Sequence, residues 1–254
     1  MITLESLDRW KAAAIHLGLS ALIALTVVAV MLALWYPQPY FDAMGGKGLL
    51  KILVGVDVTI GPLLTLIIFD RRKKSLRFDL AVIALLQLAA LVYGVYVMFE
   101  ARPVYAVFVM DRFEMVSADQ LDPADLAAGP PEYRALPLTG TKLVGTKLPD
   151  KSNPEEWNKL VFSSVGGKDA QNFPRYYVPY AEAVPAILAK ARPLSALLEG
   201  HPEREPAVRA AVAKSGQAES ALAFVPLMGR EGAMTALLDR RDARLVAVLS
   251  IDPY

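Results

Sequence analysis

The sequence predicts a membrane bundle of three transmembrane α-helices followed by a soluble α+β domain with an antiparallel sheet. Hydrophobic residues make up 54% of the 254 residues, which is high for a soluble enzyme, yet 21% are charged. The apolar residues are concentrated in the first hundred positions, whereas the later positions carry most of the charge and proline. We therefore expect residues 1–100 to form a transmembrane region and residues 101–254 a separate soluble domain.

Three apolar segments are each long enough to cross about 30 Å of hydrocarbon. They cover residues 12–35, 48–69 and 78–99. We expect the first to be retained, because it is too long for a signal peptide and no clear small-residue cleavage site precedes the letters WYPQP. Aromatic residues flank this segment and are expected to be interfacial anchors: Trp10, Trp35, Tyr36 and Tyr40.

A short basic loop separates the second and third segments. By the positive-inside rule this loop is cytoplasmic, which also places the N-terminus in the cytoplasm and residues after about 100 on the opposite side of the membrane. A basic loop can also bind anionic lipid headgroups, but a topology signal is sufficient to explain it. The basic residues are Arg71, Arg72, Lys73, Lys74 and Arg77.

Asp57 is the strongest anomaly, because an ionised carboxylate is costly inside a membrane and marks a functional candidate. It lies about nine residues, or roughly 13 Å, from the outer end of its segment. Gly61 and Pro62 follow, and proline has no N–H for the carbonyl of Val58. We therefore expect the helix to kink or open near Asp57.

Three interpretations of Asp57 remain open. It can form hydrogen bonds inside the bundle, with Gln87 or Tyr93 of the third segment as candidate neighbours, and so fix helix register. It can contact a partner helix or the terminal amine of that helix. It can also handle protons or ions, as in a small membrane sensor or transporter component. An aspartyl peptidase is disfavoured, because about 20 Å of helix separate Asp57 from Asp70, and Asp79 also lies at the cytoplasmic edge.

The soluble part begins with a predicted hairpin, VYAVFVM and FEMVS joined at DRF. Asp122-Pro123 and Asn153-Pro154 are typical helix starts, and two or three short helices are expected over residues 180–214. The Gly-, Pro- and Thr-rich residues 130–152 are expected to be extended surface. Three strands are expected at the end, the last two paired across DRRDAR, closing the sheet against the first hairpin.

The residue inventory predicts no catalysis, cofactor or metal. There is no cysteine, and His16 and His201 are the only histidines, so thiolate chemistry and a histidine-based metal site are disfavoured. GTKLVGTK is not a phosphate-binding loop, because Thr146 separates its second glycine from the lysine. A net charge of +1 without a basic stripe gives no case for nucleic-acid binding.

The membrane part resembles the TfpX/TfpZ (FimB-like) family of type IV pilin accessory proteins. The resemblance covers about residues 9–117 and rests on RWKAAAIHLGLS, LWYP, VGVDVTIGPLLTLIIF, the third segment with its continuation to VYAVF, and DRFEMV. It implies a non-catalytic protein of the bacterial inner membrane that assists or modulates pilin assembly. Its implied partners are a major or minor type IV pilin, membrane lipids and the pilus assembly machinery. Residues shared as pattern only are Asp57, Gly61, Pro62, Asp79, Gln87 and Arg102.

The resemblance also suggests what Asp57 would contact. It implies that pilins carry one long N-terminal helix with a free amine after processing, and a buried acid can accept such an amine. In the soluble part, the aromatic run FPRYYVPY is either a recognition surface or core packing. The candidate partner-binding residues are Asp57, Gly61, Pro62, Gln87, Tyr93, Tyr176 and Tyr177.

Overall fold

The computed structural model describes residues 8–150, 152–199 and 201–254. The chain divides into two compact units. The helical unit comprises the described residues up to Leu34 together with Gly46–Glu100, and the soluble unit comprises Trp35–Gly45 together with Ala101–Tyr254. The short segment Trp35–Gly45 therefore belongs structurally with the later part of the chain.

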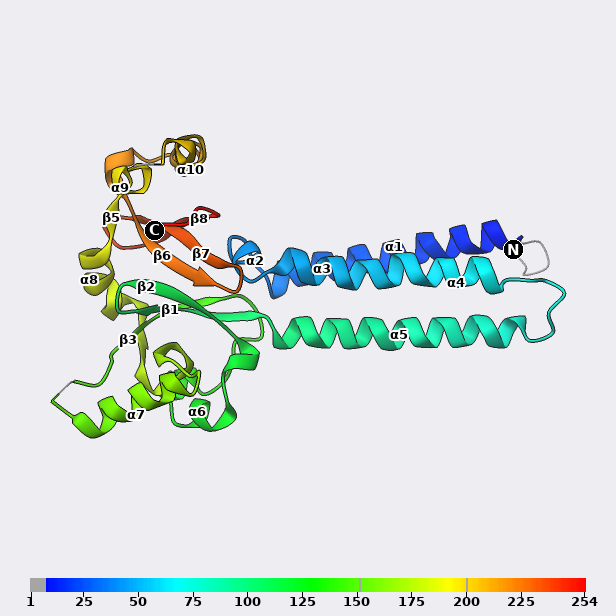
Figure 1. Cartoon of the computed structure of the whole chain (residues 1–254), viewed down its shortest axis with the longest axis horizontal. Coiled ribbons are helices and arrows are strands. Elements are labelled where there is room, and N and C mark those ends of the chain that lie inside the picture. Colours follow the sequence, from blue (N-terminus) through cyan, green and yellow to red (C-terminus); the bar gives the residue numbers. More distant parts are fainter. Residues whose placement is uncertain (1–7, 151, 200) are drawn as a thin grey trace. The chain divides into compact units, whose positions relative to one another are not determined.

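The helical unit consists of two long helices and a broken helical segment. The long helices are α1 (Arg9–Leu34) and α5 (Leu76–Glu100), which run in the same direction in Figure 1. The broken segment runs in the opposite direction and packs against both. It consists of α3 (Gly46–Gly55), the π-helical turn η2 (Val56–Ile60) and α4 (Gly61–Ile68).

The prediction of three transmembrane helices is wrong. Among the described residues, two helices, α1 and α5, are long and apolar enough to cross a membrane. The predicted second span, residues 48–69, consists of three shorter pieces, with boundaries after Gly55 and after Ile60. The physical reason is local, because Pro62 cannot donate the hydrogen bond that would continue a regular α-helix.

Small side chains form the inner face of α1. Ala12, Ser20 and Ala24 are buried at intervals of four or eight residues, which is one face of a helix. The opposite faces of the long helices expose large apolar side chains, among them Leu25 of α1 (68% exposed) and Leu85 of α5 (67%). Exposed apolar helices of this length are consistent with membrane anchoring.

The segment after α1 is part of the soluble unit rather than an interfacial belt. Tyr36 and Tyr40 are buried, and α2 (Tyr40–Ala43) packs beside the turn between two strands of the sheet. The backbone N–H of Glu231 donates to the carbonyl oxygen of Ala43 at 3.4 Å. The prediction that Tyr36 and Tyr40 are membrane anchors is therefore wrong, whereas Trp10 is 70% exposed on α1.

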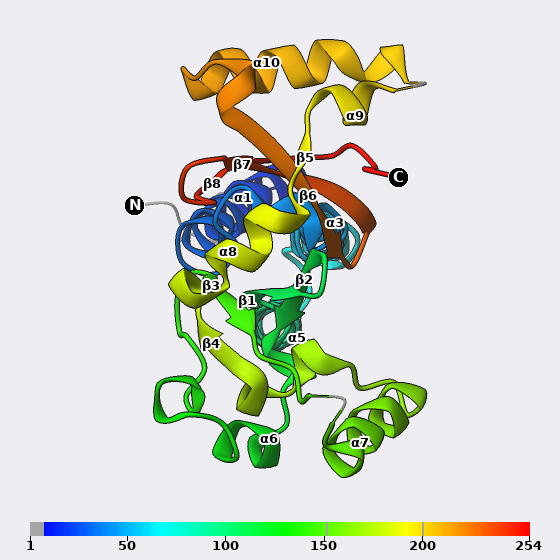
Figure 2. The same ribbon diagram turned by 90° about the vertical axis from the view of Figure 1, so that its left-hand side faces the viewer.

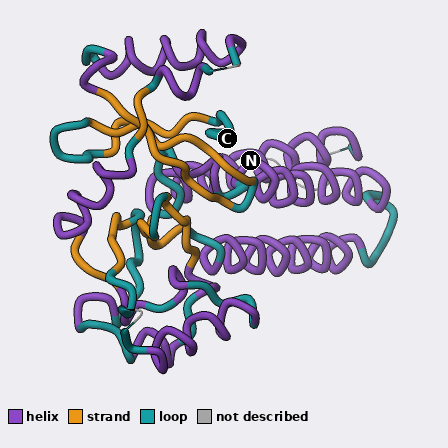
Figure 3. Tube along the Cα trace, turned by 60° about the vertical axis from the view of Figure 1, so that its left-hand side comes forward, coloured by secondary structure: helices purple, strands orange, loops and turns teal. Residues whose placement is uncertain are grey.

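The soluble unit is built on a mixed sheet, shown in Figures 2 and 3. In the described residues its strand order is β4-β3-β1-β2-β6-β7-β8, and β5 pairs with β6. The strands are β1 (Pro103–Val109), β2 (Arg112–Ser117), β3 (Lys142–Thr146), β4 (Tyr177–Pro179), β5 (Arg192–Pro193), β6 (Leu222–Gly229), β7 (Gly232–Asp239) and β8 (Leu245–Leu249).

The prediction of an antiparallel sheet is wrong in two places. β3 lies parallel to β1, with Val107 opposite Val144, and β6 lies parallel to β2, with Phe113 opposite Leu227. The segment expected to be extended surface thus supplies an inner strand, and Val144 is 2% exposed. The predicted hairpin β1–β2, the terminal pair β7–β8 and the α+β class are confirmed.

Helices surround this sheet at both ends of its strand order (Figures 2 and 3). The cap at Asn153 is present as expected, because its Oδ1 accepts a hydrogen bond from the N–H of Glu156 at 3.4 Å. The α-helices are α6 (Pro123–Ala127), α7 (Pro154–Val165), α8 (Tyr180–Lys190), α9 (Ser195–Leu198) and α10 (Glu205–Ser215). The 3₁₀ turns are Ala118–Gln120, Pro131–Tyr133, Ala170–Asn172, Pro174–Tyr176, Pro202–Arg204 and Glu219–Ala221.

Among the described residues, two hydrophobic clusters lie in the soluble unit. The larger one lies between β1, β3 and the helices after them, and it contains Tyr105, Val144 and Tyr177. The second lies under α9 and α10 and contains Leu197, Phe224 and Leu237. The first cluster thus packs on the β1 and β3 part of the sheet and the second on the β6 and β7 part.

Candidate functional site

The helix opens at Asp57, as the sequence predicts, and it opens as a π-turn. In a π-turn each N–H reaches the carbonyl five residues earlier, so the donor for the Asp57 carbonyl would be residue 62. That residue is Pro62, which has no N–H. Instead, Nε2 of Gln87 on α5 donates to the Asp57 carbonyl oxygen at 3.0 Å.

Gly61 makes room for this contact. A Cβ atom at position 61 would lie 1.9 Å from Nε2 of Gln87, well inside van der Waals contact. Any larger residue would therefore displace the Gln87 amide from the π-turn. Three candidates that the sequence marks beside Asp57 thus share a structural role. They keep the turn open and hydrogen-bonded to α5, and they are Gly61, Pro62 and Gln87.

The Asp57 carboxylate is buried and faces a cavity. Its residue is 8% exposed, and its Oδ1 has no hydrogen-bond partner in the part of the chain that the structure describes. It lines a cavity of about 240 Å³, to which no described Lys or Arg contributes. A buried carboxylate oxygen without a donor is energetically unfavourable, so this site is suited to accept a donor from outside the unit.

The cavity lies in a groove between α1 and α5, and we call this groove the Asp57 groove. Its walls are the exposed apolar side chains of Leu19 (59% exposed) and Leu88 (58%). Its polar floor is supplied by His16, Ser20, Asp57 and Gln87, and the remaining lining residues are Ile23, Ala84 and Leu91. The arrangement can hold an apolar segment that carries one polar or cationic group.

His16 belongs to this site, although sequence reasoning considered it only as a metal ligand. Its Nδ1 lies 2.6 Å from Oγ1 of Thr65 on α4 and shares a hydrogen bond with it. The spacing in the sequence could have indicated this position. His16 lies four residues from both Ala12 and Ser20, so it shares the inward face of α1 with them. The described residues contain no cluster of three or more acidic or histidine side chains that could hold a metal.

The other candidate residues lie elsewhere. Tyr93 is 69% exposed on α5 and is not among the residues lining the groove. Tyr176 and Tyr177 are buried in the larger hydrophobic cluster of the soluble unit. The hydroxyl of Tyr177 donates to the carbonyl of Gln171, and that of Tyr176 to Glu156 at 3.3 Å. The burial of both rings favours core packing as the interpretation of the aromatic run FPRYYVPY.

The basic loop between α4 and α5 is held by ion pairing. Nζ of Lys73 lies 2.6 Å from Oδ2 of Asp79, which also accepts a hydrogen bond from Ser75 at 3.3 Å. Ala12 at the start of α1 packs with Phe69 and Leu76, so the beginning of α1 and this loop lie at the same end of the helical unit. The basic residues Arg9 and Lys11 therefore lie at the end that carries the loop.

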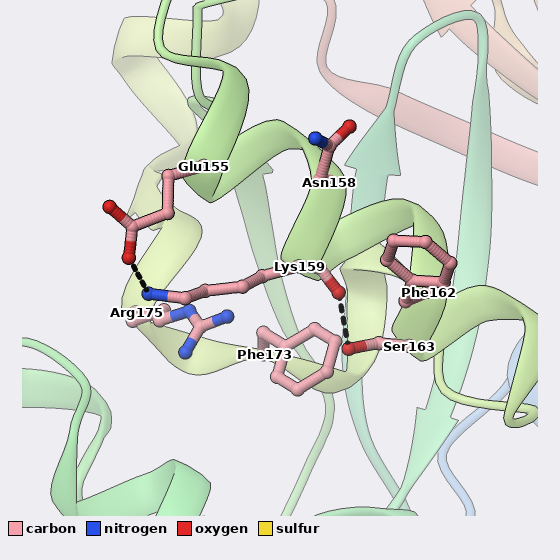
Figure 4. Close-up of a pocket in the computed structure, with 7 residues that line it drawn as sticks. All are labelled: Glu155, Asn158, Lys159, Phe162, Ser163, Phe173 and Arg175. Atoms are coloured by element: carbon pink, nitrogen blue, oxygen red, sulfur yellow. Dashed lines mark hydrogen bonds and ion pairs between the residues drawn. The ribbon is translucent and has the colours of Figure 1, made fainter.

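A second concave surface lies in the soluble unit beside α7 (Figure 4), and we call it the α7 cleft. It is open and has a volume of about 720 Å³. Its lining includes Glu155, Lys159 and Phe162 of α7, and Phe173 and Arg175 of the following segment. Nζ of Lys159 is paired with Oε1 of Glu155 at 2.8 Å.

Comparison with known proteins gives consistent results. The sequence profile of a family described as fimbrial assembly protein FimB matches residues 5–45. A fimbrial assembly protein of serogroup I from Dichelobacter nodosus is 29% identical over 247 residues, which cover 96% of this chain and 95% of that protein. The serogroup E1 protein of the same organism is 28% identical over 247 residues, with the same two coverages.

A third relative is more similar over a shorter region. The fimbrial assembly protein of Dichelobacter nodosus serogroups C1 and C2 is 38% identical over 109 residues, which cover 42% of this chain and 83% of that protein. No solved structure matches the chain. The similarity to the first two relatives extends through the soluble unit, well beyond the 9–117 region that carried the resemblance.

Proposed function

This chain belongs to the FimB family of fimbrial assembly proteins, and from that premise we propose that it is a non-catalytic accessory protein of the bacterial inner membrane. In this proposal it binds a type IV pilin in the membrane and assists or modulates the assembly of that pilin. The observation that carries the proposal is the Asp57 groove. It combines apolar walls open to the surroundings with a buried carboxylate that has an unused acceptor. This combination suits a guest helix better than a small polar metabolite.

The proposed orientation follows from charge. Arg9, Lys11 and the basic loop lie at one end of the helical unit, and the positive-inside rule assigns this end to the cytoplasm. The soluble unit continues from Leu34 and Glu100, at the other ends of α1 and α5. We therefore assign the soluble unit to the periplasm, where it would meet the part of a pilin that lies outside the membrane.

The groove suggests how the pilin would be held. An apolar pilin helix would lie against Leu19 and Leu88, and its terminal amine would reach the Asp57 carboxylate. Opposite charges interact strongly where water is excluded, and a buried charge left unpaired is costly. The amine would thus give the groove a preference for a helix that carries a cationic group over one that is purely apolar.

Neutralising Asp57 tests the proposal. We expect Asp57→Asn, which keeps the shape and removes the charge, to reduce the amount of pilin recovered with the full chain from native membranes by about tenfold or more. Asp70→Asn is the matched control, because Asp70 is an exposed carboxylate in the loop. Unchanged pilin recovery and piliation in Asp57→Asn, at equal membrane levels, would show that Asp57 serves only the internal structure of the bundle.

A further inference from the structure

The α7 cleft has features that packing of the soluble unit does not explain. Phe162 is 73% exposed and Val165 is 84% exposed, on a helix whose Leu160 is its buried contact with the core. Large apolar side chains exposed together on a soluble surface are typical of interaction sites. Phe162 and the ring of Phe173 both line the cleft, so its walls are partly aromatic (Figure 4).

Arg175 supplies a positive charge that lies over two aromatic rings, those of Phe173 and Tyr176. Its guanidinium carbon lies 4.9 Å from the ring centroid of Phe173 and 4.8 Å from that of Tyr176. No carboxylate of the described residues forms an ion pair with Arg175, whereas Lys159 is neutralised by Glu155. The aromatic contacts fix the plane of the guanidinium and leave its N–H groups available for hydrogen bonds.

We propose that the α7 cleft is a docking site for a segment of a partner protein that carries a carboxylate next to an aromatic or large aliphatic side chain. The carboxylate would bind the Arg175 guanidinium, which matches it in a two-pronged geometry, and the apolar side chain would pack against the exposed ring of Phe162. This inference is independent of the Asp57 groove, because it concerns a different unit and different residues.

The charge distribution favours one carboxylate over an anionic lipid surface. Glu155 and Glu156 lie at the start of α7, and the Glu156 carboxylate accepts the hydroxyl of Tyr176 at 3.3 Å. A sheet of anionic headgroups would bring negative charge to these acids as well as to Arg175. A single carboxylate can be placed at Arg175 alone, so a peptide segment fits the charge pattern better.

Defined peptides test the proposal. The probe is a labelled hexapeptide, GDFLDG, and its control is the amide counterpart GNFLNG, each titrated by fluorescence anisotropy onto the full chain in nanodiscs of zwitterionic lipid. We expect saturable binding of GDFLDG and at least about tenfold weaker binding of GNFLNG. Arg175→Gln should weaken GDFLDG to the same degree. Arg192→Gln is its matched control, because Arg192 is also exposed and stacks on an aromatic ring, that of Phe224, outside the cleft.

Two further variants test the apolar contacts in the α7 cleft. Phe162→Ser should weaken GDFLDG several-fold, whereas Val165→Ser should not, although both side chains are exposed on α7. The proposal is overturned if GDFLDG does not bind saturably, if GNFLNG binds equally well, or if Arg175→Gln and Arg192→Gln behave alike. Displacement of GDFLDG by vesicles of phosphatidylglycerol, but not by phosphatidylcholine vesicles, would instead identify the cleft as a lipid site.

Discussion

Nε2 of Gln87 lies 3.0 Å from the backbone carbonyl oxygen of Asp57 and takes the place of the N–H that Pro62 lacks. This hydrogen bond joins α5 to the π-turn that carries Asp57. The groove is therefore a product of three elements, because α1 and α5 supply its walls and the broken segment supplies its floor. Variants of Gly61 and Gln87 should therefore change the shape of the Asp57 groove without removing the Asp57 carboxylate.

Gly61 and Gln87 are expected to be coupled. Gln87→Ala removes the hydrogen bond to Asp57, and Gly61→Ala displaces the same amide, so each should cost about 1 kcal/mol of stability. In the Gln87→Ala background, Gly61→Ala should cost much less, because the atoms that it would displace are gone. A double-mutant cycle of thermal unfolding in detergent, combined with pilin recovery, measures this coupling.

Gly18→Ala serves as the control for this cycle. No described atom outside its own helix lies within 4 Å of a Cβ at position 18, so the substitution should be neutral or slightly stabilising through helix propensity. Additive effects of Gly61→Ala and Gln87→Ala would contradict the account of the π-turn, because independent sites do not show an interaction energy.

Gly229 is expected to hold the segment after α1 on the soluble unit. A Cβ at this position would lie 2.2 Å from the carbonyl oxygen of Ala43, and backbone cannot move aside as a side chain can. Gly229→Ala should therefore cost about 1–3 kcal/mol and expose residues 35–45 to protease. Limited proteolysis of the full chain in detergent checks this, and unchanged cleavage rates would show that the contact is dispensable.

Tyr105, which is buried, and Tyr180, which is partly buried, should respond differently to loss of their hydroxyl groups. The hydroxyl of Tyr105 has no hydrogen-bond partner among the described residues, whereas that of Tyr180 donates to the carbonyl of Ala243 at 2.5 Å. Tyr105→Phe should be neutral or stabilising, and Tyr180→Phe should cost about 1 kcal/mol. Thermal unfolding of the two variants side by side gives the answer, and equal losses would contradict this assignment of hydrogen bonds.

The soluble unit should lose stability in alkaline solution. Burial raises the pKa of Tyr105 to about 12, with the neighbouring Tyr133 adding to the effect, and burial raises that of Tyr180 to about 12, with Asp242 adding to it. The unfolded chain loses these protons near pH 10 while the folded chain keeps them. The contribution of these tyrosines to stability is therefore complete below pH 10 and is lost as the pH rises from 10 to 12.

The loss of stability at alkaline pH should depend on individual tyrosines. Thermal unfolding of the full chain at pH 8, 10 and 11 should show a decrease only above pH 10, and Tyr180→Phe should reduce the slope. A slope that Tyr180→Phe leaves unchanged would mean that other groups control the alkaline transition.

Local signals in the sequence predicted the parts of the fold that local contacts determine. The hairpin β1–β2 and the helix start at Asn153 follow from residues that are neighbours in the chain. The parallel pairing of β3 with β1 does not, because Phe108 and Gly145, which lie opposite each other, are 37 residues apart in the sequence. A Gly-, Pro- and Thr-rich segment carries no periodic signal that would mark it as an inner strand.

The site was predictable in part for the same reason. Asp57, Gly61, Pro62 and Gln87 were identifiable because a charge and a proline are unusual in an apolar segment. The contact of His16 with Thr65 required the packing of α1 on α4, which spacing alone does not reveal. Tyr93 is six residues from Gln87, or roughly 240° around the helix, so the two side chains cannot share one face.

Photo-crosslinking from within the Asp57 groove tests the central claim most directly. A photoreactive residue placed at Leu88, which lines the groove, is compared with one at Leu85, which is similarly exposed on α5 but does not line it. In native membranes the account predicts a pilin adduct from position 88, little or none from position 85, and loss of the adduct in Asp57→Asn. Equal pilin adducts from both positions, or only lipid and self-adducts from position 88, would contradict it.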